Sequence, residues 1–234
     1  MVKCKLDDKN IGLTKILFDL KQSLDLYKLI ALNASEINAK GTGKSFFATT
    51  QRLAIKSYVI DICKIFEEKK RYELNSIPEI LTFIQEKQII PIDFDPIKDF
   101  AIKNGITINQ NSNYFKELNY ILDNFLAENK EDFKRYKAFR DKKIAHTEDT
   151  KDRFDTLPSY DVMEKLLFFA IDFYEMIHEA YIGGIPVNHK NDKRCFDSLH
   201  KLLGKVGHND IKVDFDRNEE EEWGHTLISD YKQK

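Results

Sequence analysis

The sequence predicts an all-α protein, a bundle of long antiparallel helices followed by a small C-terminal extension. Two observations support this fold class. Apolar residues recur at alternating spacings of four and three over long stretches, which is the pattern of one face of an α-helix. Before residue 180 the sequence shows no convincing alternation of apolar and polar residues, the pattern that a half-buried β-strand would give.

Two long helices are predicted before residue 70. The second runs from about Ser45 to Lys69, and a short loop around Gly41 and Gly43 precedes it. The first carries the clearest amphipathic stripe, which is formed by Leu13, Leu17, Leu20, Leu24, Tyr27 and Ala31.

Shorter helices are predicted in the middle of the chain. Ser76 and Glu79 form a capping box with Pro78 in the first turn, so a helix should start there and run to about Glu86. Residues 89–96 are predicted to be non-helical, because each of their two prolines disfavours the helical conformation of the residue before it. A short helix should then end before residue 104. The apolar period returns at 115–125, and the next helix should begin near Glu131 and run into residues 139–147.

Residues 159–180 are apolar on more than one face, which places this helix at the centre of a bundle or at an oligomer interface. A polar loop at 147–157 should precede it. Beyond residue 184 the composition changes. We predict one short helix there, at about 196–206, followed by a polar tail with four consecutive acids at 219–222. We therefore predict a helical domain at residues 1–184 and an extension with a short helix and an acidic tail at 185–234.

Charge and cysteine content restrict the class of protein. Lysine and arginine total 37 against 39 acids, so a protein that coats nucleic acid along its whole surface is not expected. The three cysteines are too scattered for a disulfide framework, and Cys63 lies in an apolar helical run as a small buried hydrophobe. No signal-peptide core and no membrane-length apolar run occurs, so we expect a soluble cytoplasmic protein.

Several short motifs are better explained as local structure than as chemistry. Gly43-Lys44-Ser45 resembles the end of a phosphate loop, but Asn38 stands where that loop requires glycine. His178-Glu179 begins like a zinc-protease helix, but Ile182 stands where the second histidine is needed. The acid pairs at 93/95 and 214/216 are more typical of capped turns than of cation sites. We therefore expect no metal and no cofactor.

The segment 134–143 is different, because it holds six basic residues against Asp141 alone, a local charge of +5. Tyr136 and Phe139 are interleaved with these cations, and such a patch attracts phosphate backbones. The alternative is a solvated helix face on which Glu131 supports Arg135 one turn away.

Arg140 falls on the same stripe as Phe133, Tyr136 and Ile144, where an unpaired guanidinium would be costly. His146 follows where the apolar pattern stops. Together an arginine and a histidine supply what cleavage of RNA by its own 2′-hydroxyl requires, namely an acid or base and a cation for the phosphorane, without a metal. His146 could equally cap the helix C-terminus, where a cation is favoured, and the physical arguments leave these two interpretations near parity.

The pattern Arg140-Asp141-x4-His146 resembles the motif of the HEPN superfamily, the all-helical domains of prokaryotic toxins and related defence nucleases. The phrase Arg-Asp-Lys-Lys-Ile-Ala-His is most similar to its abortive-infection branch, the AbiU-like proteins. There too, long N-terminal helices precede the motif and a strongly apolar helix follows it. The resemblance covers roughly residues 10–182.

The resemblance implies an RNA-cleaving homodimer in which the motifs of two protomers form one composite site. Arg140 would clamp the scissile phosphate, His146 would act as general acid or base, and Asp141 would orient one of them. The stripe that holds Arg140 would then face the partner. The basic patch, independently of the resemblance, predicts that Lys137, Lys142 and Lys143 supply affinity for the RNA backbone. Other members of the superfamily bind nucleotide, RNA or a protein partner without chemistry, so a non-catalytic module, with or without a cognate antitoxin, is the alternative. A third hypothesis is a structural domain in which Arg140 pairs with a buried acid.

Overall fold

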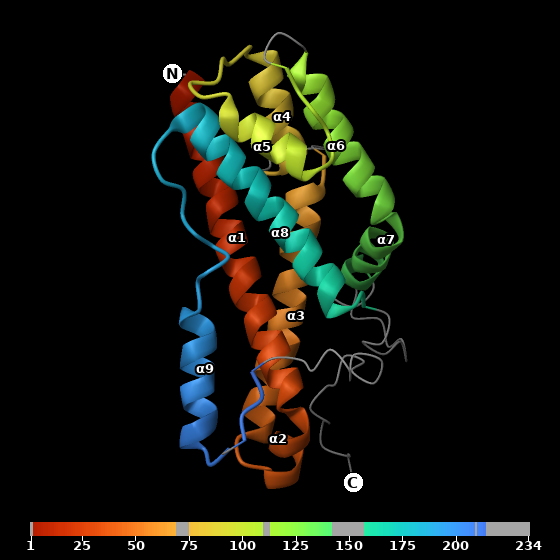
Figure 1. Ribbon diagram of the computed structural model, residues 1–234. Helices are drawn as coiled ribbons and strands as arrows, with labels where there is room; N and C mark the ends of the chain where they lie inside the picture. The colour runs from red at the N-terminus through yellow and green to blue at the C-terminus, as the bar shows by residue number, and fades with distance from the viewer. Residues whose placement is uncertain (1, 69–74, 110–112, 142–156, 209, 214–234) are drawn as a thin grey trace.

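The computed structural model describes residues 2–68, 75–109, 113–141, 157–208 and 210–213. Over these residues the chain forms helices, turns and connecting segments and contains no β-strand, which confirms the all-α prediction. Figure 1 shows the long first helix as the axis of the molecule, with the other helices arranged along its length. None of the described helices is both long and apolar enough to cross a membrane.

The core is built on a long antiparallel helical hairpin. Helix α1 (Val2–Leu32) begins earlier than its apolar stripe suggested, and α3 (Lys44–Phe66) packs along it over most of its length (Figure 1). The short α2 (Ala34–Lys40) lies between them, and the chain reverses at Gly41 and Gly43 with φ of 71° and 69°, where glycine carries no steric penalty. All six stripe residues predicted for the first helix, from Leu13 to Ala31, are at most 2 % exposed.

The capping box predicted at Ser76 is confirmed. Its hydroxyl accepts a hydrogen bond from the backbone N–H of Glu79 at 3.4 Å, and α4 spans Ile77–Glu86. The prediction of a non-helical segment up to residue 96 is wrong at its end, because α5 (Asp95–Lys103) has Pro96 in its first turn. Proline is tolerated there, since the first N–H groups of a helix have no partner within it. The carboxylate of Asp93 accepts from the backbone N–H of Asp95 at 3.0 Å, the turn cap expected of this acid pair.

Helices α6 (Tyr114–Glu128) and α7 (Lys130–Phe139) follow one another with Asn129 alone between them. The Asn129 side chain is buried and donates to the carbonyl of Phe125 at 2.7 Å, which satisfies a free carbonyl at the end of α6. The ring of Phe66, the last residue of α3, contacts Phe125 and Phe133 with centroids 5.7 and 5.0 Å apart. The end of α3 is therefore packed against both helices.

Helix α8 (Tyr160–Ile177) lies at the centre of the bundle, as its apolar composition predicted. It packs on α1, α3 and α5, and most of its residues are buried. Ser159 caps it by accepting from the N–H of Val162, and it continues as a π-helical segment, His178–Ile182. Residues 147–156 of the predicted preceding loop lie outside the described residues.

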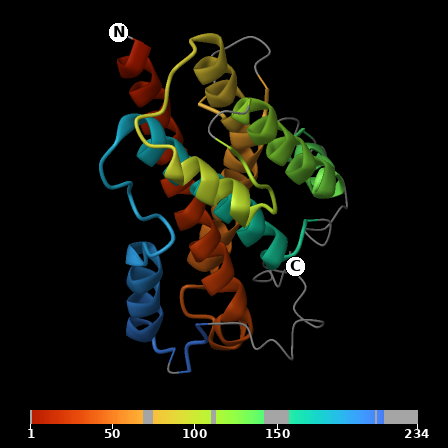
Figure 2. The ribbon, with the colours of Figure 1, turned by 45° about the horizontal axis from the view of Figure 1, so that its top comes forward.

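Helix α9 (Arg194–Lys205) starts two residues before the predicted position and lies beside α1 in both Figure 1 and Figure 2. After it, the backbone of Lys212 both donates to and accepts from the side chain of Asn33 at 2.9 and 3.0 Å. A second apolar cluster joins α9 to the α1–α3 hairpin; it contains Leu29, Ile30, Ala34, Ile37, Phe47, Ala48, Leu199 and Leu203. The division at residue 184 stays a prediction, and the acidic tail lies outside the described residues.

Candidate functional site

The structure describes half of the predicted site. Arg140, Asp141 and Lys137 are described, whereas Lys142, Lys143 and His146 lie outside the described residues. The site can therefore be built from its arginine outward, and the distance between Arg140 and His146 stays untested.

The arginine stands where α7 ends. Phe133, Tyr136 and Phe139 anchor this helix with 7, 0 and 6 % of their surface exposed. Regular helix stops at Phe139, and Arg140 and Asp141 form the beginning of a wider π-helical turn. The aromatic residues of the predicted stripe are thus packed into the protein's own core. They are not open to a partner, contrary to the expectation that this stripe faces one. Ile144 lies outside the described residues.

Arg140 is paired with two carboxylates. Its Nη1 donates to Oε1 of Glu67 at 2.5 Å, and its Nε donates to Oδ1 of Asp141 at 2.9 Å. The side chains of Arg140 and Glu67 are 28 and 31 % exposed, while Asp141 is 59 % exposed. The expectation that a guanidinium on this stripe needs a partner is confirmed, and Asp141 does contact Arg140. The sequence did not identify Glu67, which lies 73 positions away.

Glu67 is aimed at Arg140 because α3 ends one residue before it. The backbone of Glu67 is extended, with φ −82° and ψ 138°, so its side chain leaves the helical direction. The predicted second helix continued to Lys69, which would have kept Glu67 within a helix. No glycine or proline marks the earlier end, and the packing of Phe66 against α6 and α7 accounts for it.

The charges around Arg140 affect the neighbouring ionisable groups. Partial burial opposes the charged form of Arg140, but its hydrogen bonds with Glu67 and Asp141 outweigh that effect and raise the pKa of the guanidinium. Burial raises the pKa of the Cys63 thiol to about 11, although the positive charge of Arg140 acts in the opposite direction. Arg140 is therefore a permanent cation, and Cys63 is the small buried hydrophobe that the sequence predicted.

A cavity of about 560 Å³ opens beside this arrangement, between the end of α3 and α7. Its apolar part is formed by Cys63, Phe66, Leu126 and Phe133, and its charged lining consists of Glu67, Glu68, Lys130, Lys134 and Lys137. Lys130 was not among the predicted ligand-binding residues; its position one turn before Lys134 on α7 is the signal that could have found it.

The basic segment is partly neutralised by its own helix. Lys134 pairs with Glu131 and Arg135 with Asp132, each at 3.6 Å, so the predicted pairing of Glu131 with Arg135 is wrong. Both pairs are spaced by three residues, and all their side chains except that of Asp132 are largely exposed; pairs of this type contribute little free energy. Lys137 lines the cavity, and within the described part of the chain no ion pair or hydrogen bond engages its ammonium.

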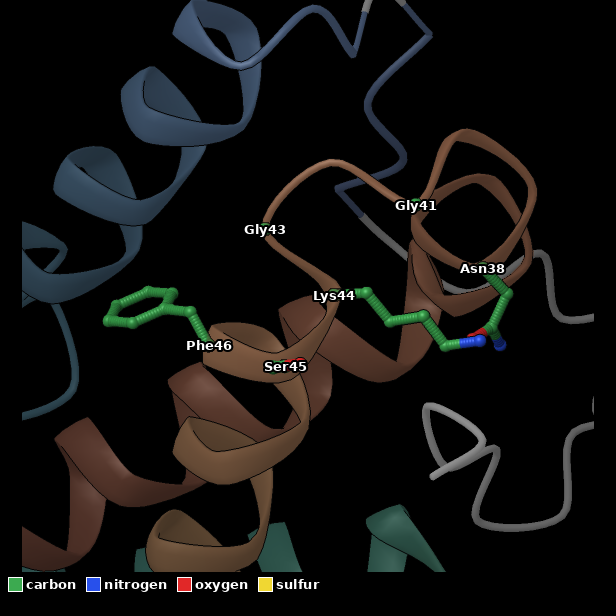
Figure 3. Close-up of a pocket in the computed structure, with 6 residues that line it drawn as sticks. All are labelled: Asn38, Gly41, Gly43, Lys44, Ser45 and Phe46. Carbon is green, nitrogen blue, oxygen red and sulfur yellow. The ribbon is translucent and has the colours of Figure 1, made fainter. Parts of the chain in front are cut away.

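Gly43 ends the loop that the sequence predicted, and Lys44 and Ser45 already form the first turn of α3. This loop follows α2, whereas a phosphate loop follows a buried strand. A cavity of about 330 Å³ lies beside it; in Figure 3 the side chain of Lys44 extends towards Asn38, while Phe46 points the other way, towards α9.

The other motif with an alternative explanation is His178-Glu179. Nδ1 of His178 lies 3.2 Å from Nδ2 of Asn10, within hydrogen-bond distance. Among the residues that the structure describes, no group of three or more His, Cys, Asp or Glu is placed to hold a metal ion.

An all-α bundle in which long N-terminal helices precede Arg140 and a strongly apolar helix follows it is the architecture that the HEPN resemblance implies. A family model of HEPN type, described as AbiU2, matches residues 3–201. The chain therefore belongs to the AbiU2 family of the HEPN superfamily. The match extends beyond the expected range of 10–182 and includes most of α9. No curated protein and no solved structure matches the chain significantly.

Proposed function

We propose that this protein is a metal-independent endoribonuclease of the toxin or antiviral-defence type that cleaves RNA in the cytoplasm. The observation that carries the proposal is the position of Arg140. A partly exposed, permanently charged guanidinium lies beside a cavity that three lysines line, and the family motif places a histidine six residues further on. Family membership supports the defence context.

Each motif residue has a distinct role in this proposal. Arg140 binds the scissile phosphate and stabilises the charge that develops on the phosphorane. His146 transfers a proton as general acid or base. Asp141 orients the guanidinium through the Nε contact that it already makes. The products are a 2′,3′-cyclic phosphate and a 5′-hydroxyl, since the 2′-oxygen attacks and the 5′-oxygen leaves.

Backbone affinity in this proposal comes from Lys137, Lys142 and Lys143. Binding through cations releases counterions from the RNA, so affinity should fall steeply as the salt concentration rises. The active unit is a homodimer in which two motifs meet, and a cognate antitoxin or regulatory protein restrains it. Because the aromatic stripe of α7 is buried, the contact between protomers is made by residues other than Phe133, Tyr136 and Phe139.

A non-catalytic module that binds nucleotide, RNA or a protein partner is the second candidate. One observation favours it: Arg140 is already paired with two carboxylates, as a group that maintains local structure would be. The two candidates differ in whether RNA is cut in the presence of a chelator.

The test is cleavage of end-labelled single-stranded RNA by the purified full-length protein in excess chelator. Arg140→Ala and His146→Ala should each reduce the rate by about 100-fold or more, the usual contribution of such groups. Arg135→Ala is the matched control, because it removes a nearby arginine of α7 that pairs with Asp132 and not with Glu67. Circular dichroism would verify that all variants are folded. RNA cutting at the wild-type rate by the doubly substituted protein would contradict the assignment, and RNA binding without cutting would support the second candidate.

A further inference from the structure

The guanidinium of Arg140 is occupied on both of the edges that a phosphate would use. Its N–H groups lie in one plane and form two forks, one from Nε and Nη2 and one from Nη1 and Nη2. A phosphate bound in bidentate fashion takes both nitrogens of one fork. Asp141 engages Nε of the first fork and Glu67 engages Nη1 of the second. A phosphate therefore gains a complete fork only when one carboxylate moves away.

Glu67 is the carboxylate that an entering ligand meets. It lines the cavity between α3 and α7 together with Lys130, Lys134 and Lys137, whereas neither Asp141 nor Arg140 lines it, so the cavity reaches the guanidinium through Glu67. The Glu67 side chain is 31 % exposed, so the ion pair is within reach of solvent and can exchange. Its backbone lies outside the last turn of α3, which allows the side chain to turn without disturbing the helix.

The three lysines give this cavity the charge that a phosphodiester strand requires. Among the described residues of the lining, Glu67 and Glu68 stand against these three lysines, which leaves one net positive charge. A polyanion that enters the cavity is attracted by the lysines and repelled by Glu67 at the same time.

We propose that Glu67 is a gate on Arg140: its carboxylate occupies the place of the RNA phosphate, and a single-stranded RNA that enters along the lysine-lined cavity displaces it. This inference rests on the proposed function, because it takes RNA as the ligand of Arg140. It adds a residue that the family motif does not contain. The gate holds the guanidinium in position while no RNA is bound and lowers the affinity for weak or short polyanions.

The experiment measures binding of a 2′-O-methylated single-stranded RNA, which cannot be cleaved, to the full-length protein by fluorescence anisotropy. Glu67→Gln keeps the size of the side chain and removes its charge. It should tighten binding by about 3- to 10-fold, the range expected when a partly exposed ion pair no longer competes. Glu68→Gln is the matched control, because it makes the same change in net charge in the same cavity without a bond to Arg140. It should change the affinity by less than about 2-fold.

Two further variants make the result decisive. Glu67→Asp retracts the carboxylate without removing its charge and should also tighten binding, which provides a second measure if Glu67→Gln fails to fold. In an Arg140→Ala background, Glu67→Gln should give no gain beyond that of Glu68→Gln, because the competition acts through the guanidinium.

The possible results separate this inference from the function on which it rests. Binding that is unchanged or weaker in Glu67→Gln, together with loss of binding in Arg140→Ala, would overturn the gate alone and make Glu67 a positioning residue. Equal binding by the wild type and Arg140→Ala would overturn both the gate and the proposed use of Arg140.

Discussion

Phe125 and Phe169 stack face to face, with ring centroids 3.7 Å apart and 10° between the ring planes. This contact joins α6 to the central helix α8. Only Asn129 separates α6 from α7, so a contact that fixes the end of α6 also supports the start of the helix that leads to Arg140. The candidate site is thus supported by an aromatic contact to which none of its own residues contributes.

Replacement of Phe169 by alanine should therefore affect both stability and the site. Phe169 is 7 % exposed, and removal of a buried phenyl ring costs about 3–5 kcal/mol of unfolding free energy. The neighbouring Phe168 is 38 % exposed, so Phe168→Ala should change the free energy by no more than about 0.5 kcal/mol. Urea unfolding followed by circular dichroism measures both, and equal losses would contradict the assigned core.

Leu203 and Leu202 allow the same comparison on α9. Leu203 is fully buried against the α1–α3 hairpin, whereas Leu202 is 37 % exposed. Leu203→Ala should lower the free energy of unfolding by about 2–4 kcal/mol, while Leu202→Ala should have little effect. A single cooperative unfolding transition that shifts as a whole in Leu203→Ala would show that α9 belongs to the helical domain. A separate early transition would instead support the division predicted at residue 184.

The thiol of Cys63 should be unreactive at neutral pH. Burial raises its pKa to about 11 from an ordinary 9.0, so the thiolate is suppressed roughly 100-fold, and the side chain is 1 % exposed. In a protein with Cys4 and Cys195 replaced by serine, iodoacetamide at pH 8 should alkylate Cys63 at least about 100-fold faster in urea than in the native state. The native rate should rise as the pH approaches 11. Equal rates in the two states would show that the thiol is accessible.

Asp192 should stabilise the protein in a pH-dependent way. The guanidinium of Arg194 donates to its carboxylate through Nε and Nη2, both at 2.9 Å, and lowers the pKa of Asp192 to about 2 from 3.8. A carboxylate whose pKa is lower in the folded state stabilises the protein above the unfolded pKa and loses that effect as the pH falls.

Asp192→Asn should therefore lower the free energy of unfolding by about 1 kcal/mol at pH 7, a value reduced for the exposure of Arg194. The difference from the wild type should shrink as the pH falls from about 4 to about 2. Urea unfolding at several pH values measures this difference. A constant difference over that range would mean that the ion pair is not its cause.

Much of the fold follows from residue spacing. The stripe from Leu13 to Ala31, the capping box at Ser76 and the apolar composition of 159–180 each predict an element that the structure contains, because these signals act within one helix. The errors fall where local rules compete. The rule that proline disfavours helix in the residue before it predicts no helix at Asp95, but the first turn of α5 tolerates Pro96. The end of α3 at Phe66 depends on aromatic contacts with α6 and α7 that no neighbouring residue signals.

The candidate site was predicted only in part for the same reason. Spacing placed Arg140 on a buried stripe and required a partner for it. It could not name Glu67, because that pairing exists only once α7 lies against the end of α3. Likewise the cavity with Lys130 is formed by residues from three helices, and helix periodicity describes each helix separately.

The separation of 73 positions between Glu67 and Arg140 also has a consequence for folding. Contacts between residues distant in sequence form late, after the entropy of closing the intervening loop has been overcome. During translation Glu67 is made 73 residues before Arg140, so their ion pair cannot form until α7 has been synthesised. The guanidinium acquires its position only when α7 docks, so a destabilised or unfinished chain lacks an ordered site. In an enzyme that degrades RNA, this order of events would protect the messenger RNA from the chain being translated on it.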